Sequence, residues 1–488
     1  MSKKISSPLS SFACILFLLN LVSCGGGGNE SPSLKLCGNG TGACSVTTPD
    51  NSGTNTGNNN NSGSNNTEIG LPATYANICT ASMEKSWVRA HLNDVYLWYK
   101  QIVDVPTANY STPQSYFDAL LVKQNDRFSF TADKDEIDGY FEAGEDVSFG
   151  YKLVNQNNQL RVAYVQPGSP ADLQQIKRGA QIIGLNGTPI GQVSYDNQIA
   201  ALYPSSSQIT TRFEIKDVGA STTRIVDIKA TTVITKPVLQ NKIITTPDNR
   251  RLGYLLFTDH IATASDPLVN SLREFKEQGI NDLILDVRYN GGGYIYIANE
   301  VASMIAGSKA QGHVFEQLQY NDKHADWTAQ NKFMFANKSR SGIDLPQLNL
   351  SRVFVLTSAR TCSASESIIN GLSPFVQVIT IGGTTCGKPY GFSQTDNCKT
   401  AYFAIEFDGV NDAGNGGYVN GFAPSCPATD DLEHDLGSLS ERLLANAATY
   451  GKSGICGPSG YTPPPALTSS SAIADHEPHA WRNNRIRK

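Results

Sequence analysis

The spacing of apolar positions changes along the chain, and each change predicts a different kind of structure. Between residues 80 and 140, apolar side chains recur at helical spacing, as in SWVRAHLNDVYLWYKQIV. A second helix is expected in STPQSYFDALL, with Ser111 or Thr112 as its N-cap. Between residues 141 and 236 the apolar runs are short and separated by turn residues. DVSFGYKLV, LRVAYVQ, QIIGLNG and RIVDIKATTV therefore predict short strands.

From residue 250 to residue 460, apolar runs alternate with amphipathic stretches. The apolar runs RLGYLLF, DLILDVR, RVFVLTS and VQVITIGG show little polar alternation, so we expect strands that are buried on both faces. Stretches with helical periodicity, such as DPLVNSLREFKEQG and YIANEVASMIAG, lie between them. The alternation predicts an α/β layer.

The two ends of the chain differ from this pattern. A short positive region precedes LSSFACILFLLNLVS, an apolar run typical of an export signal. Its end, LVSC, resembles a bacterial lipobox, which implies removal of residues 1–23 and lipidation of Cys24. A plain secretory peptide is the alternative. Residues 24–70 are rich in Asn, Gly and Ser and are predicted to be a disordered tether, and residues 461–488 a disordered tail.

Composition excludes some classes of function. The chain has 488 residues and a formal net charge of −5, and it contains no long basic run, which argues against a nucleic-acid surface. Without Cys14 and Cys24, eight of the ten cysteines remain. In an exported protein they suggest disulfides, whose pairing the sequence does not give. No C-x-x-C occurs, which argues against a zinc knuckle or a thioredoxin-type site. The sequence shows no metal cluster, so we predict no metal site and no cofactor.

The stretch RTCSASESIING holds the first candidate for chemistry. Ser363 and Glu366 fit the S-x-x-E capping box, which by itself indicates only a helix start. Lys388 follows Ser363 by 25 positions, within a glycine-bordered stretch. Burial lowers the pKa of a lysine, and a neutral amine can take the proton of a serine hydroxyl. The segment GGTTCGK, from Gly382 to Lys388, also resembles a phosphate-binding loop, but Pro389 stands where that loop needs Ser or Thr.

The stretch LILDVRYNGGGY holds the second candidate. A predicted buried strand leads into a run of three glycines that ends at Gly293. Consecutive glycines let backbone N–H groups face a cavity without interference from side chains. Such N–H groups are suited to an oxyanion hole. A flexible turn between a strand and a helix is the structural alternative.

Taken in order, DVRYNGGG, SASE and GK resemble the C-terminal processing peptidases, which are serine peptidases with a Ser–Lys dyad and a PDZ domain. SPADLQQIKRGAQIIGLNG resembles the usual PDZ pattern. The resemblance implies an α/β fold with a crotonase/ClpP-like ββα protease core at residues 239–460. It also implies a PDZ domain at residues 141–238 and a small N-terminal helical region at residues 71–140.

The resemblance also implies roles for individual residues. Ser363 would be the nucleophile, Lys388 the general base and Glu366 a supporting acid. The oxyanion donors would be Ala364 and either Gly292 or Gly293. A C-terminal carboxylate would bind the PDZ loop SFGY, which consists of Ser148, Phe149, Gly150 and Tyr151. This sequence departs from the family at two positions. The first is Phe392, which stands where the family often has a glutamine that orients the lysine; Gln394 is the nearest candidate for that role. The second is Cys362, which stands where small residues are common.

These observations predict an exported, lipid-anchored serine endopeptidase of the bacterial cell envelope, sorted by its signal to the outer membrane. Its partners would be polypeptides with exposed C-termini and, through Cys24, the membrane. The oligomeric state stays open. A non-catalytic peptide- or ligand-binding protein on the same fold is the main alternative, and an acyl hydrolase acting on other substrates is a third interpretation.

Overall fold

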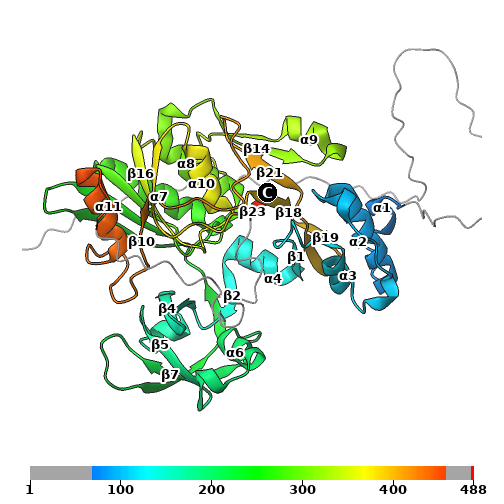
Figure 1. The fold of residues 1–488 in the computed structure, drawn as a ribbon, viewed down its shortest axis with the longest axis horizontal. Helices are drawn as coiled ribbons and strands as arrows, with labels where there is room; N and C mark the ends of the chain where they lie inside the picture. Colours follow the sequence, from blue (N-terminus) through cyan, green and yellow to red (C-terminus); the bar gives the residue numbers. More distant parts are fainter. Residues whose placement is uncertain (1–68, 458–484, 488) are drawn as a thin grey trace, which may run out of the picture. The chain divides into compact units, whose positions relative to one another are not determined.

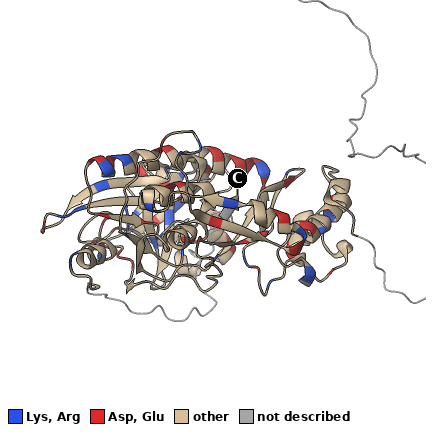
Figure 2. Cartoon of the chain, turned by 90° about the horizontal axis from the view of Figure 1, so that it is seen from above, with Lys and Arg blue, Asp and Glu red and all other residues tan. Residues whose placement is uncertain are grey.

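The computed structural model describes residues 69–457 and the backbone of residues 485–487. The predicted signal, Cys24, the tether and most of the predicted tail lie outside these residues. Among the described helices, none is both long and apolar enough to cross a membrane. Acidic and basic side chains are interspersed along the described elements, as Figure 2 shows.

The N-terminal region is helical. Its elements are α1 (Pro72–Tyr75), α2 (Ala81–Val95), α3 (Pro113–Leu120) and α4 (Lys134–Asp138). Helix α3 begins at the predicted place, because Thr112 accepts a hydrogen bond from the Ser115 N–H at 3.1 Å. Helix α2 buries Trp87, Val88 and Leu92 in the main hydrophobic core. The helical spacing of apolar residues therefore marks the face that packs on the rest of the chain.

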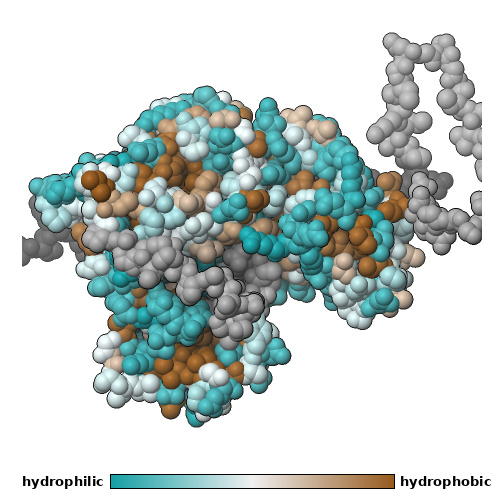
Figure 3. Space-filling model, in the orientation of Figure 1, coloured by the Kyte–Doolittle hydropathy of each residue, from teal (hydrophilic) through white to brown (hydrophobic). Residues whose placement is uncertain are grey.

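The next region carries a PDZ domain. Five of its strands follow each other in the order β3-β4-β5-β7-β8, and β6 pairs with β5. The elements are β2 (Glu145–Ser148), β3 (Tyr151–Gln156), β4 (Gln159–Val165), α5 (Pro170–Leu173), β5 (Gln181–Leu185), β6 (Thr188–Pro189), α6 (Tyr195–Leu202), β7 (Thr210–Lys216), β8 (Arg224–Lys229) and β9 (Thr231–Ile234). Phe149, Val162 and Phe213 belong to a separate small core. Figure 3 shows apolar side chains on its surface in the area where β7 and α6 lie in Figure 1.

The third region contains the predicted α/β layer, whose sheet has the order β10-β11-β12-β16-β17-β22. The strands are β10 (Val238–Thr245), β11 (Arg251–Phe257), β12 (Asp282–Asp286), β16 (Arg352–Thr357), β17 (Gln377–Gly382) and β22 (Cys426–Pro427). All pair in parallel except β10, which is antiparallel to β11.

Both faces of this sheet are covered. The helices are α7 (Ser265–Glu277), α8 (Ile295–Ala306), α10 (Ala364–Leu372) and α11 (Arg442–Ser453). Along β12, Leu283 and Leu285 join the core that contains α7, α8 and α10, whereas Ile284 joins the core that contains α11. The absence of polar alternation in these strands thus reflects burial on two faces, as predicted.

A second, mixed sheet borders this layer, with the order β13-β23-β18-β21-β14-β15. Its strands are β13 (Gly293–Tyr294), β23 (Arg485–Arg487), β18 (Tyr390–Ser393), β21 (Phe407–Val410), β14 (Val314–Tyr320) and β15 (Lys332–Met334). Residues 485–487 were expected to be disordered but form a strand, because β13 and β18 each pair with them. The end of the chain therefore lies beside these strands in Figure 1.

Candidate active site

Ser363 lies at the turn between β16 and α10, where it is the N-cap residue of the helix. Its φ of +60° is unusual for a residue with a side chain, and such backbone strain is concentrated at functional sites. The side chain is fully buried, and among the described residues its Oγ has no hydrogen-bond partner. Only the Glu366 half of the capping box is used, since the Ser363 N–H donates to Glu366 Oε2 at 2.9 Å. The hydroxyl is thus left available for chemistry.

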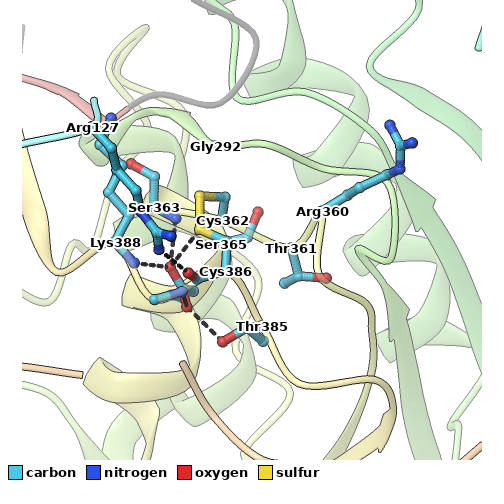
Figure 4. Close-up of a disulfide and its surroundings, with 12 residues drawn as sticks. Arg127, Gly292, Arg360, Thr361, Cys362, Ser363, Ser365, Thr385, Cys386 and Lys388 are labelled. Carbon is cyan, nitrogen blue, oxygen red and sulfur yellow. Dashed lines mark hydrogen bonds between the residues drawn. A yellow bond between two sulfur atoms is a disulfide. The ribbon is translucent and has the colours of Figure 1, made fainter. Parts of the chain in front are cut away.

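Glu366 connects the turn of Ser363 to the loop of Lys388. Besides the Ser363 N–H, its carboxylate accepts the backbone N–H groups of Gly387 at 2.8 Å and Lys388 at 2.9 Å. The Thr385 hydroxyl donates to it at 2.5 Å. Burial raises the pKa of Glu366, and these hydrogen bonds act in the opposite direction. Figure 4 shows this group of contacts around the carboxylate.

Lys388 lies in the loop between β17 and β18 and is fully buried. Burial holds its pKa well below the usual range, although Asp126 and Glu366 act to raise it. Its Nζ lies 4.3 Å from the ring centre of Phe392 and 5.1 Å from that of Phe128. This apolar environment favours the neutral amine, which is the form that a general base needs.

The structure gives Gln394 a different environment from the one expected. Its amide donates to Asp138 at 2.8 Å and to Asp396 at 3.0 Å. The prediction that Gln394 orients the lysine is therefore not supported by its contacts. The aromatic ring of Phe392, at the position where a glutamine was expected, instead packs near the Lys388 amine.

The glycine run lies directly beside the turn of Ser363. The Asn290 carbonyl accepts the Cys362 N–H at 3.1 Å and the Ser365 hydroxyl at 3.1 Å. The Gly292 N–H donates to the Asn290 side chain at 2.9 Å, so it is already engaged. Gly292 is therefore the poorer of the two predicted donors, and Gly293 is the better one.

Gly293 occupies a position that only glycine fits. Its φ is +133°, and a Cβ there would lie 2.4 Å from the carbonyl oxygen of His260. Ala364, the other predicted donor, is the first residue of α10. The N–H groups of a helix's first turn lack partners within the helix, and the helix dipole favours an anion at this end.

Sequence reasoning missed several residues of this site. One is His260, whose Nδ1 lies 2.9 Å from Asn290 Oδ1 and whose pKa burial lowers to about 3. The asparagine of DVRYNGGG was a signal for this contact. Asp126 and Phe128 come from the N-terminal region, and nothing in the local sequence places them beside Lys388.

The PDZ loop lies where a peptide terminus could reach it. Phe149 points into the PDZ core, and the Gly150 N–H donates to Ser148 Oγ at 3.2 Å. Residues Ser148, Phe149 and Tyr151 line a small pocket together with Leu202 of α6.

The described cysteines form three disulfides: Cys79–Cys398, Cys362–Cys386 and Cys426–Cys456. The second lies within the candidate site, and Figure 4 shows it next to Ser363 and Lys388. Cys362, which stands where small residues are common in the resembled family, is thus paired with Cys386, a partner that its neighbours in sequence did not indicate.

Comparisons with known proteins agree with this arrangement. Residues 251–401 match the model of peptidase family S41, residues 83–130 match the peptidase S41 N-terminal domain, and residues 141–215 match the PDZ domain. The three matches follow each other in the order of the regions described above. The chain belongs to peptidase family S41.

Individual relatives are distant. A carboxyl-terminal-processing protease of Picosynechococcus sp. is 24% identical over 229 residues, which cover 47% of this chain and 50% of that protein. The carboxy-terminal processing protease CtpA of Bacillus subtilis is 23% identical over 271 residues, 55% of this chain and 53% of that protein. The chain thus spans about half the length of the curated relatives it matches.

One solved structure is similar over most of its length. It is a Bacteroides fragilis chain assigned to the S41 proteases, with a TM-score of 0.61 and 25% sequence identity. The match covers 75% of this chain and 97% of that one. It supports the α/β peptidase fold with a PDZ domain.

Proposed function

We propose that this chain is a serine endopeptidase that captures polypeptide C-termini with its PDZ domain and hydrolyses peptide bonds with Ser363 and Lys388. The observation that carries the proposal is that a buried serine hydroxyl, unpartnered among the described residues, lies in the same cluster as a buried lysine whose pKa is strongly lowered, as Figure 4 shows. Glu366 bonds the backbone of both residues. Structural lysines are seldom fully buried, since burial disfavours their charge.

In the proposed reaction, Ser363 Oγ attacks the substrate's carbonyl carbon while its proton passes to the Lys388 amine. The N–H groups of Ala364 and Gly293 stabilise the oxyanion. The protonated Lys388 then gives its proton to the leaving amine, and an ester on Ser363 remains. Lys388 next takes a proton from water, whose attack on the ester releases the acid and restores the serine.

A substrate in an extended conformation would fit beside the proposed catalytic residues. Residues 485–487 lie between β13, which contains Gly293, and β18, which follows Lys388. The position between these strands therefore accepts an extended backbone through main-chain pairing. We propose that substrates bind at the same place.

We also propose that the chain is exported and held at a bacterial membrane by lipid on Cys24. The LVSC stretch supports this location. Three disulfides within the described residues agree with an oxidising compartment.

The proposal is tested by labelling with a fluorophosphonate and by turnover of an unstructured polypeptide. We expect the label on Ser363 in the wild type. In Ser363→Ala we expect no label and a rate lowered by about 10⁴-fold or more, with C-terminal peptide binding retained. Ser373→Ala, a matched change at the other end of α10, should keep both activities. Equal turnover by Ser363→Ala and the wild type would rule out the assignment.

A further inference from the structure

The disulfide between Cys362 and Cys386 joins the two segments that carry the proposed catalytic pair. Cys362 directly precedes Ser363, and Cys386 lies two positions before Lys388. Figure 4 shows the disulfide in the same cluster as both side chains, whereas Arg360 points away from them. No other described disulfide has a cysteine next to either residue of the pair.

The loop of Lys388 has little regular structure of its own. It connects the end of β17 at Gly382 to the start of β18 at Tyr390. Within it, the Cys386 N–H donates to the Thr361 carbonyl at 3.0 Å, and Arg127 donates to the Cys386 carbonyl at 2.9 Å. Gly387, Lys388 and Thr385 also donate hydrogen bonds to Glu366 of α10. The disulfide adds a covalent bond to these hydrogen bonds between the Lys388 loop and the turn of Ser363.

We propose that Cys362 and Cys386 are positioning residues for the peptidase reaction, and that their disulfide holds the Lys388 loop in register with Ser363. This inference rests on the proposed function. Small displacements suffice to lower the rate, because a misplacement of about 1 Å can cost about 100-fold in catalysis. Hydrogen bonds to a single carboxylate permit such displacements more readily than a covalent link does.

Reduction by a dithiol provides a reversible way to open this link. One reductant thiolate attacks a protein sulfur and forms a mixed disulfide. The second reductant thiol then closes the reductant's own disulfide and releases the protein sulfur. The protein gains two electrons and two protons, which give two thiols, and the dithiol loses the same number. Cys362 is buried and Cys386 is partly exposed, so attack is expected at Cys386.

The disulfide Cys426–Cys456 supplies a matched control. Its sequence separation is 30, compared with 24 for Cys362–Cys386, so the two loops restrict the unfolded chain to a similar extent. A purely structural role would therefore make the two double variants behave alike. A positioning role would make them differ in rate.

The first test compares Cys362→Ala/Cys386→Ala with Cys426→Ala/Cys456→Ala in the full chain. We expect the first variant to lose about 10- to 100-fold in kcat with KM changed by less than about twofold. Its fluorophosphonate labelling should slow by a similar factor. The second variant should keep both rates. Equal kcat for the first variant and the wild type would overturn the proposal.

A pH profile distinguishes positioning from loss of fold. The groups that act on the Lys388 amine include Asp126, Glu366 and the rings of Phe128 and Phe392, and Arg127 from the N-terminal region donates to the Cys386 carbonyl of the Lys388 loop. If the loop loosens, water reaches the amine and its pKa rises toward the ordinary value. The acidic limb of kcat/KM should therefore move to higher pH by about one unit. An unmoved limb in a folded variant with reduced kcat would contradict the role through Lys388.

A second measurement avoids substitutions at the site. In a chain with Cys79, Cys398, Cys426 and Cys456 replaced by alanine, a dithiol can open only the disulfide at issue among the described ones. We expect activity to fall on reduction and to return on reoxidation.

The sulfur atoms of Cys362 and Cys386 and a carboxylate oxygen of Glu366 lie within 4.8 Å of one another. A chelator is therefore included, so that thiol capture of a metal is not mistaken for loosening.

The outcomes separate this inference from the proposed function. If the wild type neither cleaves polypeptides nor labels at Ser363, the proposed function fails and this inference fails with it. If the wild type is active and the reduced chain is equally active, the inference alone fails.

Discussion

The PDZ domain and the peptidase core hold their proposed sites by different means. The PDZ loop is positioned by backbone conformation and by its own small core, and residues 141–238 contain no cysteine. The Ser363–Lys388 site is surrounded by a disulfide and a buried carboxylate with four donors. The difference fits their proposed tasks. Binding of a peptide terminus tolerates small shifts of the binding loop, whereas proton transfer between two groups requires a fixed distance between them.

We expect the largest effect on turnover from Lys388→Met, which tests the proposed base of the peptidase core. The change replaces the buried amine with an apolar chain of similar length, so folding should be retained or improved. Without a base, turnover of a polypeptide should fall by about 10³-fold or more. Because the wild-type pKa of Lys388 is lowered, wild-type kcat/KM should rise with pH through that pKa and then level off.

Lys85→Met is the control, because Lys85 is also buried and donates to the carbonyls of Thr107 and Tyr110. It should lower stability but leave kcat unchanged. If Lys388→Met keeps the wild-type rate at neutral pH, the base lies elsewhere.

A second prediction concerns the ion pairs that join the two regions. Arg178 of the PDZ domain pairs with Asp430 at 2.8 Å, and Asp430 also pairs with Arg288. We expect Arg178→Ala to lower the free energy of unfolding by about 2–3 kcal/mol, because a buried partner is removed. Burial alone would raise the pKa of Asp430, but Arg178 and Arg288 hold it at about 2. The stabilisation is therefore present above pH of about 4 and is lost as pH falls toward 2.

The control is Arg212→Ala, which removes an exposed ion pair with Asp227 in the same domain. Urea unfolding should show no measurable change for this variant, because an exposed ion pair contributes little to stability. Similar losses for both variants would mean that the contact between PDZ domain and core contributes no more than a surface pair.

The fold and the site could be predicted from the sequence to different depths. Strand burial followed from continuous apolar runs, because local pattern determines which faces are covered. Ser363 and Lys388 were singled out because the order of DVRYNGGG, SASE and GK resembles a known family, and their catalytic roles stay predictions. The contacts of Asp126 and Phe128 with the lysine environment, and the pairing of Cys362 with Cys386, depend on how distant segments pack. The hydrogen bond from the Gly292 N–H to the Asn290 side chain is likewise a contact that spacing does not reveal, and the choice between Gly292 and Gly293 as oxyanion donor stays a prediction.

A third prediction addresses the recognition side through Gly150→Ala. Gly150 has a φ of +81°, and a Cβ there would lie 2.1 Å from Ser169 Cβ, so the loop must shift. We expect KM for a polypeptide with a free C-terminus to rise about tenfold with kcat nearly unchanged. Gly187→Ala is the matched control, since Gly187 has a φ of +82° with nothing near the added Cβ. A loss of kcat without a change in KM would contradict separate tasks for the two regions.

The smallest expected effect comes from the end of the chain. Arg485 and Ile486 pair with Gly293 and Tyr294, so this strand would compete with a substrate bound at the proposed position. Ending the chain at residue 457 should lower KM for an extended peptide about two- to fivefold and leave kcat unchanged. Ile486→Pro tests the same point in the full chain, because proline lacks the N–H that a ladder needs. It should lower KM as the truncation does, whereas an unchanged KM in both variants would show that β23 does not occupy the place where substrates bind.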